Sequence, residues 1–104
     1  MFDFKNLLSQ AQGLQERIKA LQTELAEKTV TGSAGGDMVI VEFTGAQEMI
    51  SIKIEKEILS SEDPELLEDL IVAAVNDALK RSRDMMTEEM AKLTGGLRIP
   101  GLTA

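Results

Sequence analysis

The sequence contains no cysteine, histidine, tryptophan or tyrosine, and its only aromatic residues are three phenylalanines. Without cysteine the chain has no disulfide, no thiolate nucleophile and no cysteine-based metal site. Without histidine it lacks the side chain that most often activates a serine nucleophile. No apolar run approaches the ~20 residues that span a bilayer, and Asp3 interrupts the start, so we expect no signal peptide. These absences are compatible with the reducing cytoplasm and give little support to an enzyme.

Basic residues are also scarce, and the acidic residues are unevenly distributed. The chain has 11 Lys and Arg against 18 Asp and Glu, a net charge of -7, which argues against indiscriminate binding to polyanions. However, residues 61–79 hold six acidic residues and no basic one, whereas residues 80–104 hold five basic and three acidic residues. Outside the acidic block, a polyanion is therefore repelled less strongly than the net charge of the whole chain suggests.

The first apolar pattern in the chain is a narrow seam. Its spacing alternates between three and four residues for three heptads, through Phe4, Leu7, Ala11, Leu14, Ile18, Leu21 and Leu25. Such a seam is typical of a helix that lies along another helix, and it is narrower than the stripe of a helix on a domain core. The spacing predicts a helix over about residues 2–28 and an assembly, with dimerisation burying more apolar surface than 104 residues can alone.

Two alternating runs follow, over about residues 38–44 and 48–55, on either side of the turn Gly45-Ala46-Gln47. They predict an antiparallel hairpin with one buried face, which includes Ile50, Ile52 and Ile54. The β-branched run over about residues 29–33 predicts a third strand that completes a meander, and the glycine-rich segment over residues 32–36 predicts a loose turn.

A second helix is predicted over about residues 63–93, with Asp63 as its N-cap and Pro64 in its first turn. Its apolar arc narrows after Leu79 to a stripe through Met86 and Met90, and an irregular tail is expected over residues 95–104.

At 1.5 Å per residue the two predicted helices are ~40 and ~45 Å long, whereas a strand of the predicted sheet is only ~23 Å long. We therefore expect projecting helical arms, in which this stripe pairs with the first helix of the same chain or of a dimer mate.

Sites for chemistry are weakly supported. The serines have no activating partner motif, and the acidic residues at the start of the second helix are explained by the helix dipole rather than by a metal. The glycine-rich segment over residues 32–36 precedes a strand, whereas a phosphate-binding loop precedes a helix. We therefore predict no catalytic residue, no metal and no cofactor.

The run Lys80-Arg81-Ser82-Arg83 is the most informative polar feature. Its cations could bind phosphates by charge and hydrogen bonding. Asp77 lies four residues before Arg81, and Lys80 four residues before Asp84, so both could equally form ordinary ion pairs on the helix surface. The sequence pattern leaves both interpretations open.

The second helix also carries the motif on which a family resemblance rests: Leu-Leu-Glu-Asp-Leu-Ile-Val-Ala-Ala-Val-Asn-Asp-Ala over residues 66–78. It resembles the signature of the YbaB/EbfC family of bacterial nucleoid-associated proteins. Gln10-Ala11-Gln12, Val30-Thr31-Gly32, Thr44-Gly45-Ala46 and the ending over residues 93–97 also match the family pattern. The resemblance implies an α+β fold, with α-β-β-β-α protomers that form an intertwined homodimer with projecting arms. It also implies a cytoplasmic, nucleoid-associated DNA-binding protein that organises the nucleoid and affects gene expression.

From the residues and the resemblance together we expect one domain over residues 1–104 that binds double-stranded DNA with weak or broad sequence preference. We expect no membrane partner and no small-molecule substrate. The residues expected to contact phosphates are Lys5, Arg17, Lys19, Lys80, Arg81, Arg83 and Lys92. The alternative is a protein–protein adaptor that uses its acidic body and methionine-containing arms without binding DNA.

Overall fold

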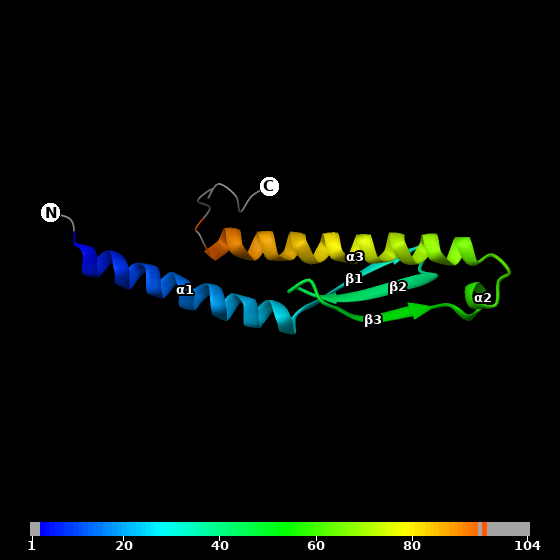
Figure 1. The fold of residues 1–104 in the computed structure, drawn as a ribbon, viewed down its shortest axis with the longest axis horizontal. Helices are drawn as coiled ribbons and strands as arrows, with labels where there is room; N and C mark the ends of the chain where they lie inside the picture. The colour runs from blue at the N-terminus through cyan, green and yellow to red at the C-terminus, as the bar shows by residue number, and fades with distance from the viewer. Residues whose placement is uncertain (1–2, 94, 96–104) are drawn as a thin grey trace.

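The computed structural model describes residues 3–93 and 95, which form two long helices connected by a three-stranded antiparallel sheet (Figure 1). The strands lie in the order β1-β2-β3, and the molecule is elongated, with extents of 73 × 23 × 16 Å. The predicted α+β fold is confirmed, and the short helix α2 is an addition to it. The elements are α1 (Phe4–Glu27), β1 (Thr29–Ala34), β2 (Val39–Thr44), β3 (Met49–Ile54), α2 (Lys56–Leu59) and α3 (Pro64–Leu93).

Side-chain caps set where the long helices begin. The Asp3 carboxylate accepts a hydrogen bond from the Asn6 N–H at 3.2 Å, and the Asp63 carboxylate accepts one from the Leu66 N–H at 3.1 Å. Each bond satisfies one of the N–H groups that a helix leaves unpaired in its first turn. The start of the first helix at residue 2 and the tail from residue 96 onward, both part of the predictions, lie outside the described residues.

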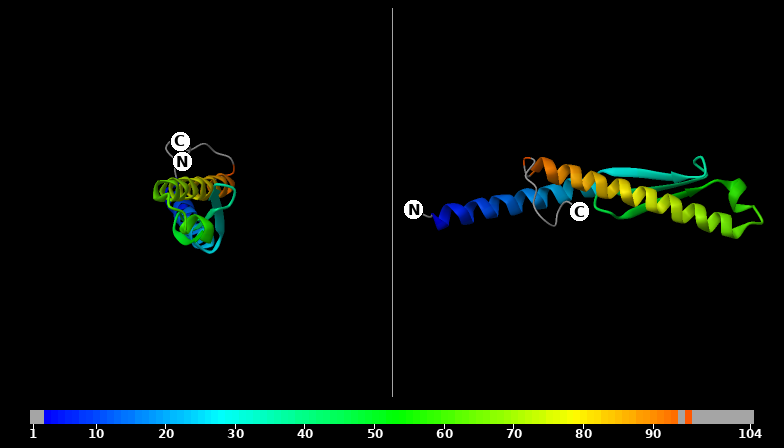
Figure 2. Two further views of the ribbon diagram at one scale, coloured as in Figure 1. Left: turned by 90° about the vertical axis from the view of Figure 1, so that its right-hand side faces the viewer. Right: turned by 90° about the horizontal axis from the view of Figure 1, so that it is seen from above.

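Helix α3 lies along one face of the sheet, over β1 and β2 (Figure 2). The buried core forms between them, from Val39, Val41 and Phe43 on β2 and Ala74 and Ala78 on α3. The small alanine side chains allow the helix backbone to approach the sheet closely.

Helix and sheet approach each other closely at Gly32, which lies in β1 and within the strand predicted over about residues 29–33. A Cβ atom at this position would overlap the backbone nitrogen of Ala78 and lie 2.6 Å from its Cα. Because no side chain fits in this space, glycine at position 32 determines how closely α3 packs on β1.

The position of α3 leaves the inner face of β3 uncovered. Val41 pairs with Ile52 across the sheet, so both side chains point to the face on which α3 lies. Val41 is fully buried, yet Ile52 is 43% and Ile50 50% exposed. The prediction of a buried isoleucine face is therefore wrong for these two residues of the single chain, while Ile54 packs against the core.

The two long helices meet near the end of α3. Leu21 and Leu25 of α1 are buried, and together with Ile18 they face Met86 and Met90 across an apolar groove of about 400 Å³. Leu79, predicted as part of the same seam, packs against the core instead. The first half of α1 extends past the end of α3, so Phe4, Leu7 and Leu14 of the seam are exposed (Figure 2).

The β2–β3 turn joins the sheet to both helices. The Ser82 hydroxyl of α3, fully buried, donates a hydrogen bond to the Thr44 carbonyl at 2.7 Å and accepts one from the Gln47 N–H at 3.1 Å. On the other side the Gly45 N–H donates to the carbonyl of Lys28, the C-cap of α1, at 2.9 Å. The turn thus fixes the base of the α1 arm relative to α3.

We predict that Gly32→Ala destabilises the fold by about 2 kcal/mol, because the added methyl group overpacks the contact between β1 and α3. Denaturant unfolding measures the loss. The control is Gly13→Ala in α1, where a Cβ atom meets nothing within 4 Å and should instead raise stability, by up to ~1 kcal/mol. Equal unfolding midpoints for the two variants would contradict the close approach.

We predict that Ser82→Ala costs about 2–3 kcal/mol of unfolding free energy, because the Thr44 carbonyl and the Gln47 N–H both lose a buried partner. The same measurement on Ser51→Ala provides the control. The Ser51 hydroxyl is exposed and makes only a 3.4 Å contact with Glu42, so its loss should change stability little. A Ser82→Ala variant as stable as Ser51→Ala would show that the turn does not depend on this hydroxyl.

Candidate nucleic-acid interface

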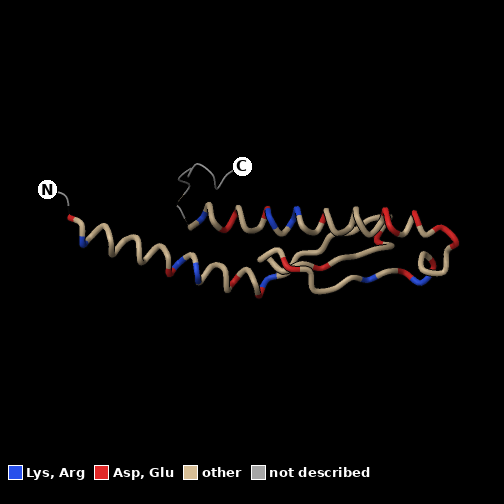
Figure 3. Tube along the Cα trace, viewed as in Figure 1, with Lys and Arg blue, Asp and Glu red and all other residues tan. Residues whose placement is uncertain are grey.

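Charge separates along the length of the molecule (Figure 3). The arm segments, residues 3–28 and 80–93, carry eight basic and seven acidic residues, a net charge of +1. The intervening body, residues 29–79, carries two basic and eleven acidic residues, a net charge of -9. In this long molecule the first half of α1 lies away from the body, whereas the segment that begins at Lys80 adjoins it (Figure 2). A polyanion is therefore repelled more strongly at the body than along the arms.

On α1 the predicted phosphate contacts are exposed but do not share one face. Lys5 and Lys19 are fourteen residues apart, which places them ~21 Å apart along the axis and within ~40° of the same direction. Arg17 is two residues from Lys19 and therefore projects ~160° away from it on the same geometry. The arm thus offers cations on two sides.

Across the junction of the two helices, the structure brings Arg17 and Lys92 to one surface groove, of about 320 Å³. Glu89 lies in the same groove, and its carboxylate is 3.3 Å from the Lys92 ammonium and 3.8 Å from that of Lys28. Lys28 is thus a basic residue of the arm base that the sequence reasoning missed. The sequence signal that could have identified Lys28 is its position directly after the last turn of α1.

The basic run on α3 does not form a single patch. Ser82 in its middle points into the fold, and Arg81 and Arg83 flank it at ~100° on either side of the helix. Lys80 points away from the sheet and is 2.9 Å from Asp84 in an exposed ion pair. The structure therefore presents these cations in three directions around the arm.

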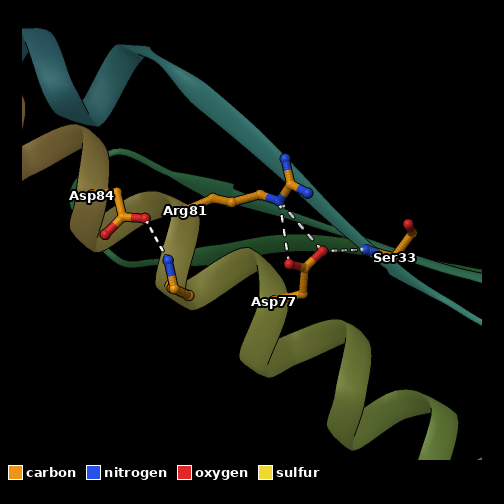
Figure 4. A network of polar contacts seen from close by, with 5 residues as sticks. Ser33, Asp77, Arg81 and Asp84 are labelled. Carbon is orange, nitrogen blue, oxygen red and sulfur yellow. Dashed lines mark hydrogen bonds and ion pairs between the residues drawn. The ribbon is translucent and has the colours of Figure 1, made fainter.

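Arg81 is the most constrained of them (Figure 4). Its Nε is 3.3 Å from both carboxylate oxygens of Asp77, and the Ser33 N–H on β1 donates to the same carboxylate at 3.1 Å. The Ser33 N–H and then Arg81 hold the pKa of the Asp77 carboxyl below its ordinary value, against the opposing effect of partial burial. Both ion pairs left open by the sequence, Asp77–Arg81 and Lys80–Asp84, are present.

Other site types find little support in the part of the chain that the structure describes. No group of three or more acidic side chains there is arranged to hold a metal ion. None of the described helices combines the length and apolar character needed to cross a bilayer. What the surface does offer is a set of exposed cations around the arms.

Comparisons with known proteins agree with the fold. A crystal structure of an uncharacterised protein from Helicobacter pylori superimposes with a TM-score of 0.82 at 25% sequence identity, covering 91% of this chain and all of that chain. A nucleoid-associated protein of Caldanaerobacter subterraneus is 50% identical over 101 residues, which is 97% of this chain and 91% of that protein. Another, from Syntrophobacter fumaroxidans, is 50% identical over 97 residues, or 93% of this chain and 88% of that protein.

The family comparison covers nearly the whole chain. Residues 1–97 match the YbaB/EbfC DNA-binding family. This range includes both arms, the sheet and all seven cations expected to contact phosphates. With its sequence motifs, its fold and its relatives in agreement, the chain belongs to the YbaB/EbfC DNA-binding family.

Proposed function

We propose that this chain is a nucleoid-associated protein of the cytoplasm that binds duplex DNA through its arms and catalyses no reaction. The observation that carries the proposal is the charge separation, with a net charge of -9 on the body and +1 on the arms. Family membership and the names of the relatives support DNA as the partner. On this proposal residues 1–104 act as one domain.

Binding through phosphates explains the expected breadth of sequence preference. The seven predicted cations are lysines and arginines spread along the two helices, and such contacts hold a duplex without reading its bases. Contacts of this kind release counterions, so affinity should fall as salt rises. We therefore propose weak or broad sequence preference.

We further propose that the protein works as a homodimer, because one chain leaves two apolar surfaces open. On α1 the uncovered seam includes Phe4, 67% exposed, and Leu7, 49% exposed. On the body the open surface includes Ile50 and Ile52 of β3. Apolar surface of this extent is unusual on a monomer and typical of an interface. A second copy is the partner that the seam periodicity predicts.

We predict that the triple variant Lys80→Ala, Arg81→Ala, Arg83→Ala binds every duplex more weakly and with a flatter salt dependence. The slope of log K against log salt should shrink by about 0.9 for each phosphate that the variant no longer neutralises. Fluorescence anisotropy with two unrelated duplexes measures both effects. The control is Lys53→Ala with Lys56→Ala, which removes cations from the body and should leave the slope unchanged.

Unchanged affinity in the triple variant would show that this part of α3 is not the phosphate-binding surface. Absence of duplex binding by the unaltered protein, combined with recovery of a specific protein partner, would favour the adaptor hypothesis.

We predict that Ile52→Glu shifts the molecular mass measured by light scattering from twice the chain mass of 11.3 kDa toward that mass itself. A buried carboxylate opposes the contact with the second copy. The control is Ser51→Glu, which adds the same charge at the neighbouring position, on the opposite face of β3, and should remain dimeric. A single-chain mass for the unaltered protein at tens of micromolar would contradict the dimer.

A further inference from the structure

Asp77 is attached to the body of the protein rather than lying loosely on the helix surface. Its carboxylate accepts the Ser33 N–H of β1 at 3.1 Å, a contact between residues 44 positions apart in the chain. The partial burial of its side chain, 34% exposed, further limits its freedom. The carboxylate therefore has a defined position at the boundary of α3 and β1.

From this position Asp77 engages only one edge of the Arg81 guanidinium. The two bonds, each 3.3 Å, both come from Nε. In Figure 4 the two terminal nitrogens lie on the far side of the guanidinium, away from the carboxylate, and the Arg81 side chain is 61% exposed. Within the described residues, the structure gives those terminal nitrogens no hydrogen-bond partner.

A guanidinium has two usable edges, and its terminal fork matches two oxygens of a phosphate group. With Nε occupied by an anchored carboxylate, the fork of Arg81 faces solvent in a restricted orientation. Such a side chain loses less conformational freedom on binding than an unrestrained arginine. The arrangement thus prepares Arg81 for a bidentate contact.

We propose that Asp77 is a positioning residue: by holding Nε of Arg81 it directs the terminal nitrogens to grip one phosphodiester group of a bound duplex. The inference rests on the proposed function, because it names how one cation of the arm meets DNA. It assigns an acidic residue a favourable role in binding a polyanion, which a simple count of charges would not do.

Simple electrostatics makes the opposite prediction, and this difference allows a sharp test. Removal of a carboxylate near DNA reduces repulsion and should tighten binding. If Asp77 positions Arg81, removal of its charge should weaken binding instead. Asp77→Asn suits the test because the amide oxygen can still accept the Ser33 N–H. The NH₂ group replaces the other oxygen and removes one of the two contacts with Nε of Arg81, and the contact that remains loses its negative charge.

The matched control is Asp84→Asn, which removes the same charge two turns along the helix and breaks the exposed pair with Lys80. We expect duplex affinity to fall about three- to tenfold in Asp77→Asn, and to stay equal or rise in Asp84→Asn. Anisotropy titrations with one labelled duplex at fixed salt measure both, and thermal unfolding confirms that each variant is folded.

Arg81→Lys gives a second test that leaves Asp77 and its bond to Ser33 in place. Because Arg81 is exposed, this substitution should not disturb folding. It keeps the charge but loses the fork, so we expect nearly the same loss as in Arg81→Ala. Its control is Lys53→Arg, a lysine-to-arginine exchange at an exposed position of the body, which should bind like the unaltered protein.

The outcomes separate this inference from the function it rests on. Tighter binding by Asp77→Asn, or full affinity in Arg81→Lys, would overturn the positioning role while leaving DNA binding intact. Absence of duplex binding by the unaltered protein would overturn the proposed function, and the inference with it.

Discussion

The close packing of α3 on β1 is the constraint on which the rest of the structure depends. At Gly32 the strand has no side chain, so the backbone of Ala78 lies directly against it. One residue away on each element, the Ser33 N–H meets the Asp77 carboxylate. One turn further along α3, Ser82 meets the β2–β3 turn. A single close approach therefore aligns the core, the anchored carboxylate and the base of the α1 arm.

The same packing determines what the chain leaves open. Because α3 covers β1 and β2, the inner face of β3 has no cover within the chain. Because α3 ends beside the second half of α1, the first half of the seam projects alone. Both open surfaces are apolar, and the first half of α1 projects away from the acidic body (Figure 2). The proposed assembly and the proposed DNA surface thus follow from how one helix is placed on a small sheet.

The sequence predicted features that depend on local periodicity and missed those that depend on placement. The heptad spacing, the alternation around Gly45 and the Asp63-Pro64 helix start are local signals, and the structure has each of these elements. The four residues of α2 are too few to show a period. The exposure of Ile52 could not be foreseen, because it depends on which strands α3 covers.

The candidate site shows the same division. The exposed cations of both arms could be named from the sequence, since lysines and arginines off an apolar seam face solvent. How these cations are grouped in space could not be predicted. Ser82 in the middle of the basic run is buried against the fold, so Arg81 and Arg83 lie on opposite sides of the helix. The link between Asp77 and Ser33 joins positions 44 residues apart and has no sequence signal.

The central claim is that the arms of this acidic protein bind duplex DNA through its phosphates. Fluorescence anisotropy of a labelled duplex, titrated with the unaltered protein across a series of salt concentrations, tests it most directly. The account predicts binding at low salt and a clearly negative slope of log K against log salt. A slope near zero, or no binding at low salt, would contradict it.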